Sequence, residues 1–273
     1  MVMRLGITPI LYFAFIIPIL AILDIRVVFE PPLLTFMLHG VFTCSMSLVV
    51  SYLSARSYLV SGMVTILLLG CGTMVFGVTA LLSASLIGGP NFLVTVQNSG
   101  ILLASAFHFL SATLASLGLA LQVSKYRKLV VITAYLGVLV FAALITMACL
   151  QGVIPVFFIQ GIGATALRQF MLGGAIVLFA TSSLLFIRLY FKSKSDVLYW
   201  YSLAMVLITE SLFSWFFAKA AGSPISWAGR VAVYLSAIYF LVAILILVRG
   251  VRKKMKNEKS QYEEKGAAFL IHE

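Results

Sequence analysis

Eight long apolar runs alternate with short polar connections along the 273 residues of this chain. Each run is close to the about 20 mainly apolar residues that an α-helix needs to cross the hydrocarbon of a bilayer. Helices satisfy their own backbone hydrogen bonds in lipid, so the pattern predicts an all-α, polytopic membrane helix bundle. The predicted spans are 7–28, 33–54, 59–83, 99–123, 128–149, 169–190, 197–218 and 228–250.

Basic residues lie on alternate connections between these runs, which predicts an orientation. If the N-terminus is inside, 15 of the 19 Lys and Arg residues fall on the cytoplasmic side. The four on the outer side are Arg26, Arg168, Lys219 and Arg230. Because positive charge accumulates in cytoplasmic loops, we expect a multi-pass protein of the cell membrane with both termini in the cytoplasm.

The same pattern divides the chain into a transmembrane bundle, residues 1–250, and a short cytoplasmic tail, residues 251–273. The tail is basic first and acidic afterwards. It is too short for a catalytic domain, and a solvated, partly disordered end is favoured over a continuation of the last helix.

Composition narrows the possible functions. With 62% hydrophobic and 10% charged residues, the chain lies outside the range of soluble domains. Its net charge of +11 sits at the membrane edges, where it meets anionic lipid rather than nucleic acid. A phosphate-binding Walker loop, a nucleophile elbow and a zinc-protease helix motif are all missing, so we do not expect an enzyme. Three cysteines in separate runs lack metal-ligand spacing.

The two longest outer connections, 84–98 and 150–168, carry a single charge between them, that of Arg168. Uncharged segments that contain glycine can dip back into a bundle where protein or water satisfies their backbone groups. Ordinary apolar loops at the headgroups are the favoured interpretation.

Ionisable residues inside apolar spans are costly, and each one is a functional hypothesis. Three stand out: His39, His108 and Glu210. At about 1.5 Å per residue, His39 lies about 9 Å from the outer end of its predicted span, and the other two lie about 13 Å from theirs. We therefore expect all three in the outer half, with Arg168 and Arg230 at the mouths of their own spans.

Each of these residues also has a less specific interpretation. A lone histidine in a span is more often a hydrogen-bonded packing residue than a ligand. Glu210 should be protonated or paired with Arg168, Arg230 or His108. A haem held between His39 and His108 is a minority alternative, and a metal site built from the two histidines and Glu210 is another.

Two segments, 96–114 and 223–244, resemble the multi-helix, membrane-associated sensor regions at the N-termini of archaeal and bacterial sensor histidine kinases. The residues that carry the resemblance are Gln97, Asn98, His108, Trp227, Gly229, Arg230, Tyr234 and Tyr239. It implies a module that perceives a signal at the membrane and passes it down its last helix. The chain departs from the pattern because no PAS or kinase domain follows the last span.

These observations together predict a sensor or receptor that binds an unknown small ligand in an outer polar pocket and signals through a partner. The candidate ligand-binding residues are Glu210, His108, His39, Arg230, Arg168, Gln97 and Asn98. A secondary transporter or channel for a small solute is the alternative, and a haem-binding electron carrier comes third. No cofactor other than this haem is expected.

Overall fold

The computed structural model describes residues 2–31, 33–85, 88–119, 121–123 and 125–270, with side chains between Gly6 and Gly250. Its elements are α1 (Val2–Leu23), α2 (Leu34–Leu38), η1 (His39–Ser45), α3 (Met46–Ser61), α4 (Val64–Ser83), α5 (Pro90–Ser116), α6 (Arg127–Leu150), β1 (Phe158–Ile159), β2 (Gly163–Ala164), α7 (Ala166–Ser193), α8 (Asp196–Phe217) and α9 (Pro224–Leu270). Within this part of the chain, eight helical segments are long and apolar enough to cross a membrane. The predicted all-α bundle is confirmed.

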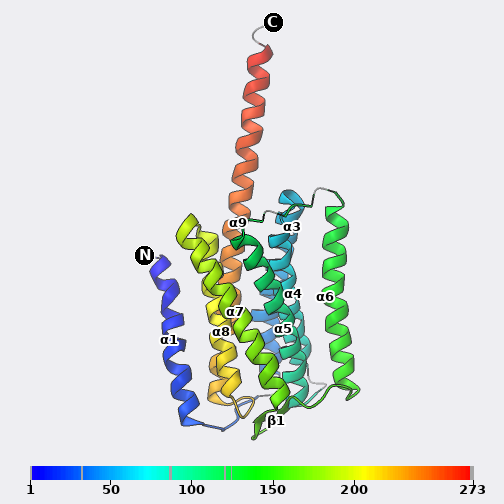
Figure 1. The fold of residues 1–273 in the computed structure, drawn as a ribbon, viewed down its shortest axis with the longest axis vertical. Helices are drawn as coiled ribbons and strands as arrows, with labels where there is room; N and C mark the ends of the chain where they lie inside the picture. The colour runs from blue at the N-terminus through cyan, green and yellow to red at the C-terminus, as the bar shows by residue number, and fades with distance from the viewer. Residues whose placement is uncertain (1, 32, 86–87, 120, 124, 271–273) are drawn as a thin grey trace.

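The two ends of the bundle differ (Figure 1). One end carries the antiparallel pair β1–β2, in which Phe158 lies opposite Ala164, and we call it the hairpin end. The opposite end, from which α9 extends beyond every other helix, is the tail end. Helix α1 also begins at the tail end, so the chain enters and leaves the bundle on the same side.

Helix α9 holds much of the bundle together by packing against α8, α3 and α1, while α5 packs against α4 and α7. Large side chains such as Phe179, Leu207 and Ile244 are fully buried between these helices. The apolar windows of α1 and α6 are only 17% and 11% buried, against 61% for α4 and α8. These two peripheral helices therefore present apolar side chains to the surroundings, as helices in contact with lipid do.

The second span is one continuous helical segment made of α2, η1 and α3. Its middle part, η1, has π-helical hydrogen bonding and begins at His39. Single π-helical turns widen a helix locally and occur frequently at functional sites. The span continues to Ser61, past the predicted end at residue 54, and stops where Gly62 adopts a positive φ of 71°.

The fourth span is shifted relative to the prediction of 99–123, because α5 begins at Pro90 and ends at Ser116. Gly89 and Pro90 form the helix start, in which the fixed φ of proline suits the first turn. Residues 90–98, predicted to belong to an outer connection, are therefore the first turns of α5. Asn98 and Gln97 are buried in this helix.

The segment between α6 and α7 folds back as a hairpin onto the start of α5. Asn91 fixes it there, because its side-chain Oδ1 accepts hydrogen bonds from the backbone N–H groups of Phe157 and Phe158 at 2.9 and 3.0 Å. Phe157 and Phe158 are buried against Val94. The hairpin thus covers the hairpin end of the bundle.

Helix α9 continues to Leu270, so the described residues of the tail form a helix rather than the partly disordered end that the sequence favoured. Residues 271–273 lie outside the described part of the chain. The last span and the tail are consequently one uninterrupted element of 47 residues.

Candidate functional site

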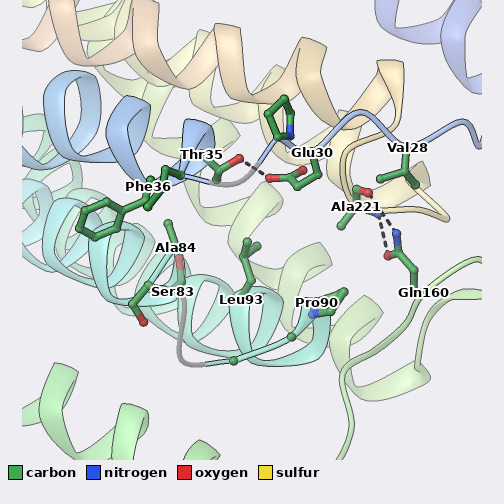
Figure 2. A pocket seen from close by; sticks show the side chains of 15 residues that line it. Val28, Glu30, Thr35, Phe36, Ser83, Ala84, Pro90, Leu93, Gln160 and Ala221 are labelled. Atoms are coloured by element: carbon green, nitrogen blue, oxygen red, sulfur yellow. Dashed lines mark hydrogen bonds between the residues drawn. The ribbon is translucent and has the colours of Figure 1, made fainter.

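A pocket of about 310 Å³ opens at the hairpin end, between the 24–33 segment, the end of α4 and the start of α5. We call it the vestibule. Figure 2 shows Glu30 and Thr35 on one side of it and Ser83, Ala84, Pro90 and Leu93 on the other. Gln160, from the hairpin, is fastened to the α8–α9 loop by two hydrogen bonds of 3.1 Å with the backbone of Ala221 (Figure 2).

The Glu30 carboxylate makes the main ionic contact at the vestibule wall. Its partner is Arg230 of α9, whose Nη1 lies 2.9 Å from Glu30 and 2.9 Å from Thr35 Oγ1. Thr35 also donates a hydrogen bond to Glu30. The Arg230 guanidinium lies over the ring of Trp227, 4.6 Å from its centroid. Arg230 is only 3% exposed, so its charge depends on these contacts.

A second, smaller cavity of about 30 Å³ lies deeper, and we call it the inner cavity. It shares Leu93 and Ala221 with the vestibule, so the two spaces adjoin at these residues. Its polar lining residues are Gln97, Asn98, Arg168, Ser226 and Arg230. About 10–15 Å³ suffices for one water molecule, and the inner cavity therefore has room for a small ion or chemical group.

The inner cavity contains two polar residues with unused hydrogen-bond donors, Arg168 in the first turn of α7 and Asn98 on α5. Arg168 is 3% exposed, and its Nη2 donates to the carbonyl oxygen of Trp215 at 3.0 Å. Its guanidinium lies 5.1 Å from the ring centroid of Phe158. The Nε and Nη1 groups of Arg168 and the Nδ2 group of Asn98 have no hydrogen-bond partner among the described residues.

The other basic residues of the hairpin end are paired. The Oδ2 atom of Asp24 forms ion pairs with Arg26 Nη2 at 2.5 Å and with Lys219 Nζ at 2.9 Å. The hydrogen bond from Arg26, followed by that from Lys219, lowers the pKa of Asp24 to about 2. The same contact raises the pKa of Arg26. Asp24 thereby links the end of α1 to the α8–α9 loop.

His39 lies next to the inner cavity and connects three elements. Its Nδ1 is 3.1 Å from the hydroxyl of Tyr234 on α9, and its Nε2 is 3.5 Å from Nε2 of the cavity residue Gln97 on α5. The imidazole is 2% exposed. His39 therefore couples the π-helical turn η1 to the cavity wall and to α9, in the half of the bundle where the sequence placed it.

His108 does not lie in that half, which corrects the sequence prediction. Because α5 begins at Pro90, His108 is about 27 Å along the helix, in the half nearer the tail end. Its Nδ1 is 2.5 Å from the hydroxyl of Tyr201, and its ring stacks on Phe240. A Cβ at Gly72 would approach its Nε2 to 2.8 Å. These contacts make His108 a packing residue of the aromatic core.

Glu210 is also separate from the inner cavity. It lines an apolar groove of about 380 Å³ between α1 and α8, beside Ile17 and Pro18. The expected pairing with Arg168, Arg230 or His108 is not present, and Glu210 Oε2 has no hydrogen-bond partner among the described residues. The structure thus groups Arg168, Arg230, Gln97 and Asn98, with His39 behind them, and leaves Glu210 and His108 elsewhere.

Two residues of this site, Glu30 and Trp215, escaped the sequence analysis. Glu30 carried a signal, since it and Asp24 are the only acidic residues before Asp196 and they lie just after and near the outer end of the first predicted span. Acidic residues there have the few outer cations as natural partners. Trp215 contributes a backbone carbonyl that accepts a hydrogen bond from Arg168, and a pattern of side chains does not predict such a contact.

Groups of three His, Cys, Asp or Glu side chains that could hold a metal ion do not occur among the described residues. In comparisons with protein-family models, curated proteins and solved structures, the chain has no significant match. The resemblance to kinase sensor regions therefore stays a prediction.

Proposed function

We propose that the chain is an eight-span membrane receptor that binds a small ligand in the inner cavity and relays binding through α9 to a partner at the tail end. Eight helices of sufficient length and apolarity support the membrane placement. The excess of Lys and Arg on the connections at the tail end supports a cytoplasmic location for that end and for both termini. The hairpin end and its vestibule then face outward.

The observation that carries this proposal is the course of α9. In its second turn this helix supplies Arg230 to the wall of the inner cavity, and it continues without interruption to Leu270, beyond the rest of the bundle (Figure 1). A ligand that changes the contacts of Arg230 therefore acts directly on the element that leaves the bundle. A small displacement of α9 at the cavity is therefore transmitted to the tail end by the same helix, without any connecting loop.

A receptor also requires two states that a ligand can distinguish. The second span offers a place for such a change at its π-helical turn, where His39 contacts both Gln97 and Tyr234. Conversion of a π-helical turn to α-helix would rotate His39 relative to α9. Ligand binding beside Gln97 can bias this equilibrium.

Transport is the main alternative, and the structure favours it less. The inward path of a transporter would follow a stripe of polar residues on α3, Ser47, Ser51 and Ser54, and these residues are packed against α4. Ser51 donates to the carbonyl oxygen of Gly70 at 2.9 Å and lies 3.1 Å from Thr73. A space of about 10 Å³ beside His108 shares no lining residue with the inner cavity.

Binding and flux measured together test the proposal. The purified protein is heated in mild detergent with a panel of amino acids, short carboxylates, amines, sugars and nucleosides, and a thiol-reactive dye reports exposure of the buried Cys44 and Cys71. A ligand that binds only the folded state raises the melting temperature. We expect at least one compound to do so in the wild type and less in Arg230→Gln, with Arg26→Gln as the matched control.

The same compound, radiolabelled, is then offered to proteoliposomes. Accumulation inside the liposomes above that of protein-free vesicles would replace the receptor by a transporter. A panel without any stabilising compound would remove the binding role of the cavity.

A further inference from the structure

Among the residues that the structure describes, the inner cavity is lined by two guanidinium groups and by no carboxylate. Arg168 and Arg230, each 3% exposed, face it together with the amide side chains of Gln97 and Asn98 and the hydroxyl of Ser226. A positive charge buried in a low dielectric is strongly unfavourable unless a negative charge or several acceptors compensate it.

The two arginines are compensated unequally. Glu30 neutralises Arg230 from the vestibule side at 2.9 Å. Arg168 has no carboxylate within ion-pair distance among the described residues, and it meets one carbonyl oxygen and one aromatic ring. The positive charge at the cavity wall that no nearby carboxylate neutralises is therefore that of Arg168.

Unused donors surround this charge. Nε and Nη1 of Arg168 and Nδ2 of Asn98 are all buried without a partner in the described part of the chain. A buried charged group that lacks a hydrogen-bond partner costs free energy, so an acceptor that reached these three donors would bind with a strongly favourable free energy. The helices α7 and α9 begin close by, at Ala166 and Pro224, and the N-terminal ends of helices favour negative charge.

We propose that the inner cavity binds one small anionic group, either a free halide ion or the carboxylate of a small acid, with Arg168 and Asn98 as its donors. A volume of about 30 Å³ accommodates a group of this size. The body of an acid would extend past Leu93 into the vestibule, where Phe36 and Val28 offer apolar contacts. This inference rests on the proposed function and names the charge of its ligand.

Thermal unfolding at constant ionic strength tests the inference. Sodium methanesulfonate, whose tetrahedral sulfonate is bulkier than chloride or a carboxylate, is replaced stepwise by sodium chloride in one series and by sodium acetate in another. We expect a saturable rise in melting temperature with at least one of them. Saturation by chloride alone identifies a free ion, and saturation by acetate with weaker action of chloride identifies a carboxylate.

Three variants locate the effect. Arg168→Gln should raise the anion concentration that gives half of the rise in melting temperature about tenfold or more, since it removes charge-assisted hydrogen bonds. Asn98→Asp places a carboxylate in the cavity, so it should raise the melting temperature in methanesulfonate and abolish the response to added chloride or acetate. Arg26→Gln removes a cation of the same end that is already paired with Asp24, and it should respond as the wild type does.

Equal melting temperatures in methanesulfonate, chloride and acetate would overturn the inference, as would an unchanged response in Asn98→Asp. If Arg168→Gln does not fold, Asn98→Asp still decides, because it keeps both arginines. This failure is distinct from failure of the proposed function: a neutral or cationic compound of the panel could still bind and act through α9, whereas anion binding without any effect on α9 would leave only the receptor role refuted.

Discussion

Replacing Glu30 by Gln removes the negative charge that faces Arg230 while keeping the shape of the side chain. In the wild type, Arg230 Nη1 lies 2.9 Å from the carboxylate, and the side chains of Arg230 and Glu30 are 3% and 31% exposed. Breaking a fully buried pair costs about 3–5 kcal/mol because one charge stays buried alone. Glu30 is partly open to the vestibule, so water screens part of this loss.

Arg230 also keeps two contacts in the variant, the ring of Trp227 and the hydroxyl of Thr35. We therefore expect a loss close to that of one hydrogen bond between charged groups, about 2 kcal/mol. For a chain of this size, that loss lowers the melting temperature by about 4–8 °C. Thermal unfolding in detergent, followed by reaction of the buried cysteines with a fluorogenic dye, measures the change.

The matched control is Asp24→Asn, which breaks ion pairs at the same end of the bundle whose members are 35–50% exposed. Exposed pairs contribute little, so the control should lower the melting temperature much less. Equal shifts in the two variants would refute the reasoning, because burial of Arg230 would then have no energetic consequence. A shift in Glu30→Gln that vanishes at high salt would refute it as well, since a buried pair is screened only weakly.

Three further outcomes follow from the structure. Gly72→Ala places a methyl group 2.8 Å from His108 Nε2 and should destabilise the protein by about 1–3 kcal/mol in thermal unfolding. In the control Gly137→Ala, the new methyl group meets no described atom within 4 Å outside the neighbouring backbone of its own helix, so this variant should be neutral or slightly stabilising. Equal behaviour of the two variants would contradict the packing described for His108. Because the folded state lowers the pKa of Asp24 from 3.8 to about 2, this carboxylate stabilises the fold fully above about pH 4, and the contribution disappears as the pH falls towards 2. Melting temperatures between pH 5 and pH 2 should therefore fall more steeply in the wild type than in Asp24→Asn, and coinciding curves would argue against the ion pairs. The purified protein should be colourless; a Soret band that is lost on replacing His39 or His108 by Ala would establish the haem alternative instead.

The existence of the eight spans could be predicted from the sequence, because the thickness of the hydrocarbon fixes a minimum length of apolar helix. Their ends were less accessible. The polar pair Gln97–Asn98 made the span seem to begin at residue 99, whereas the start of α5 depends on the local geometry of Gly89 and Pro90. That error alone moved His108 into the wrong half of the bundle.

The grouping of the site residues was predictable only in part. Arg168 and Arg230 were expected at the mouths of their spans, and both line the inner cavity. Glu210 was expected either to be protonated or to pair with Arg168, Arg230 or His108, and such a pair with an arginine would have placed it beside the cavity. The sequence reports only which face of a helix is polar, however, and which helix that face meets is decided by packing over long distances in the chain. In the structure that neighbour is α1.

The central claim, that occupation of the inner cavity acts on α9, is tested most directly by a distance measured at the tail end. Spin labels are attached to Gly250→Cys and to Lys125→Cys, with the three native cysteines replaced by Ala. An added Cβ at Gly250 meets no described atom outside the neighbouring backbone of its own helix within 4 Å, and Lys125 lies in the exposed α5–α6 loop. Pulsed electron paramagnetic resonance in liposomes then compares the distance distribution with and without the stabilising compound. The account predicts a shifted distribution that reverts in Arg230→Gln. An unchanged distribution at saturating compound would contradict it.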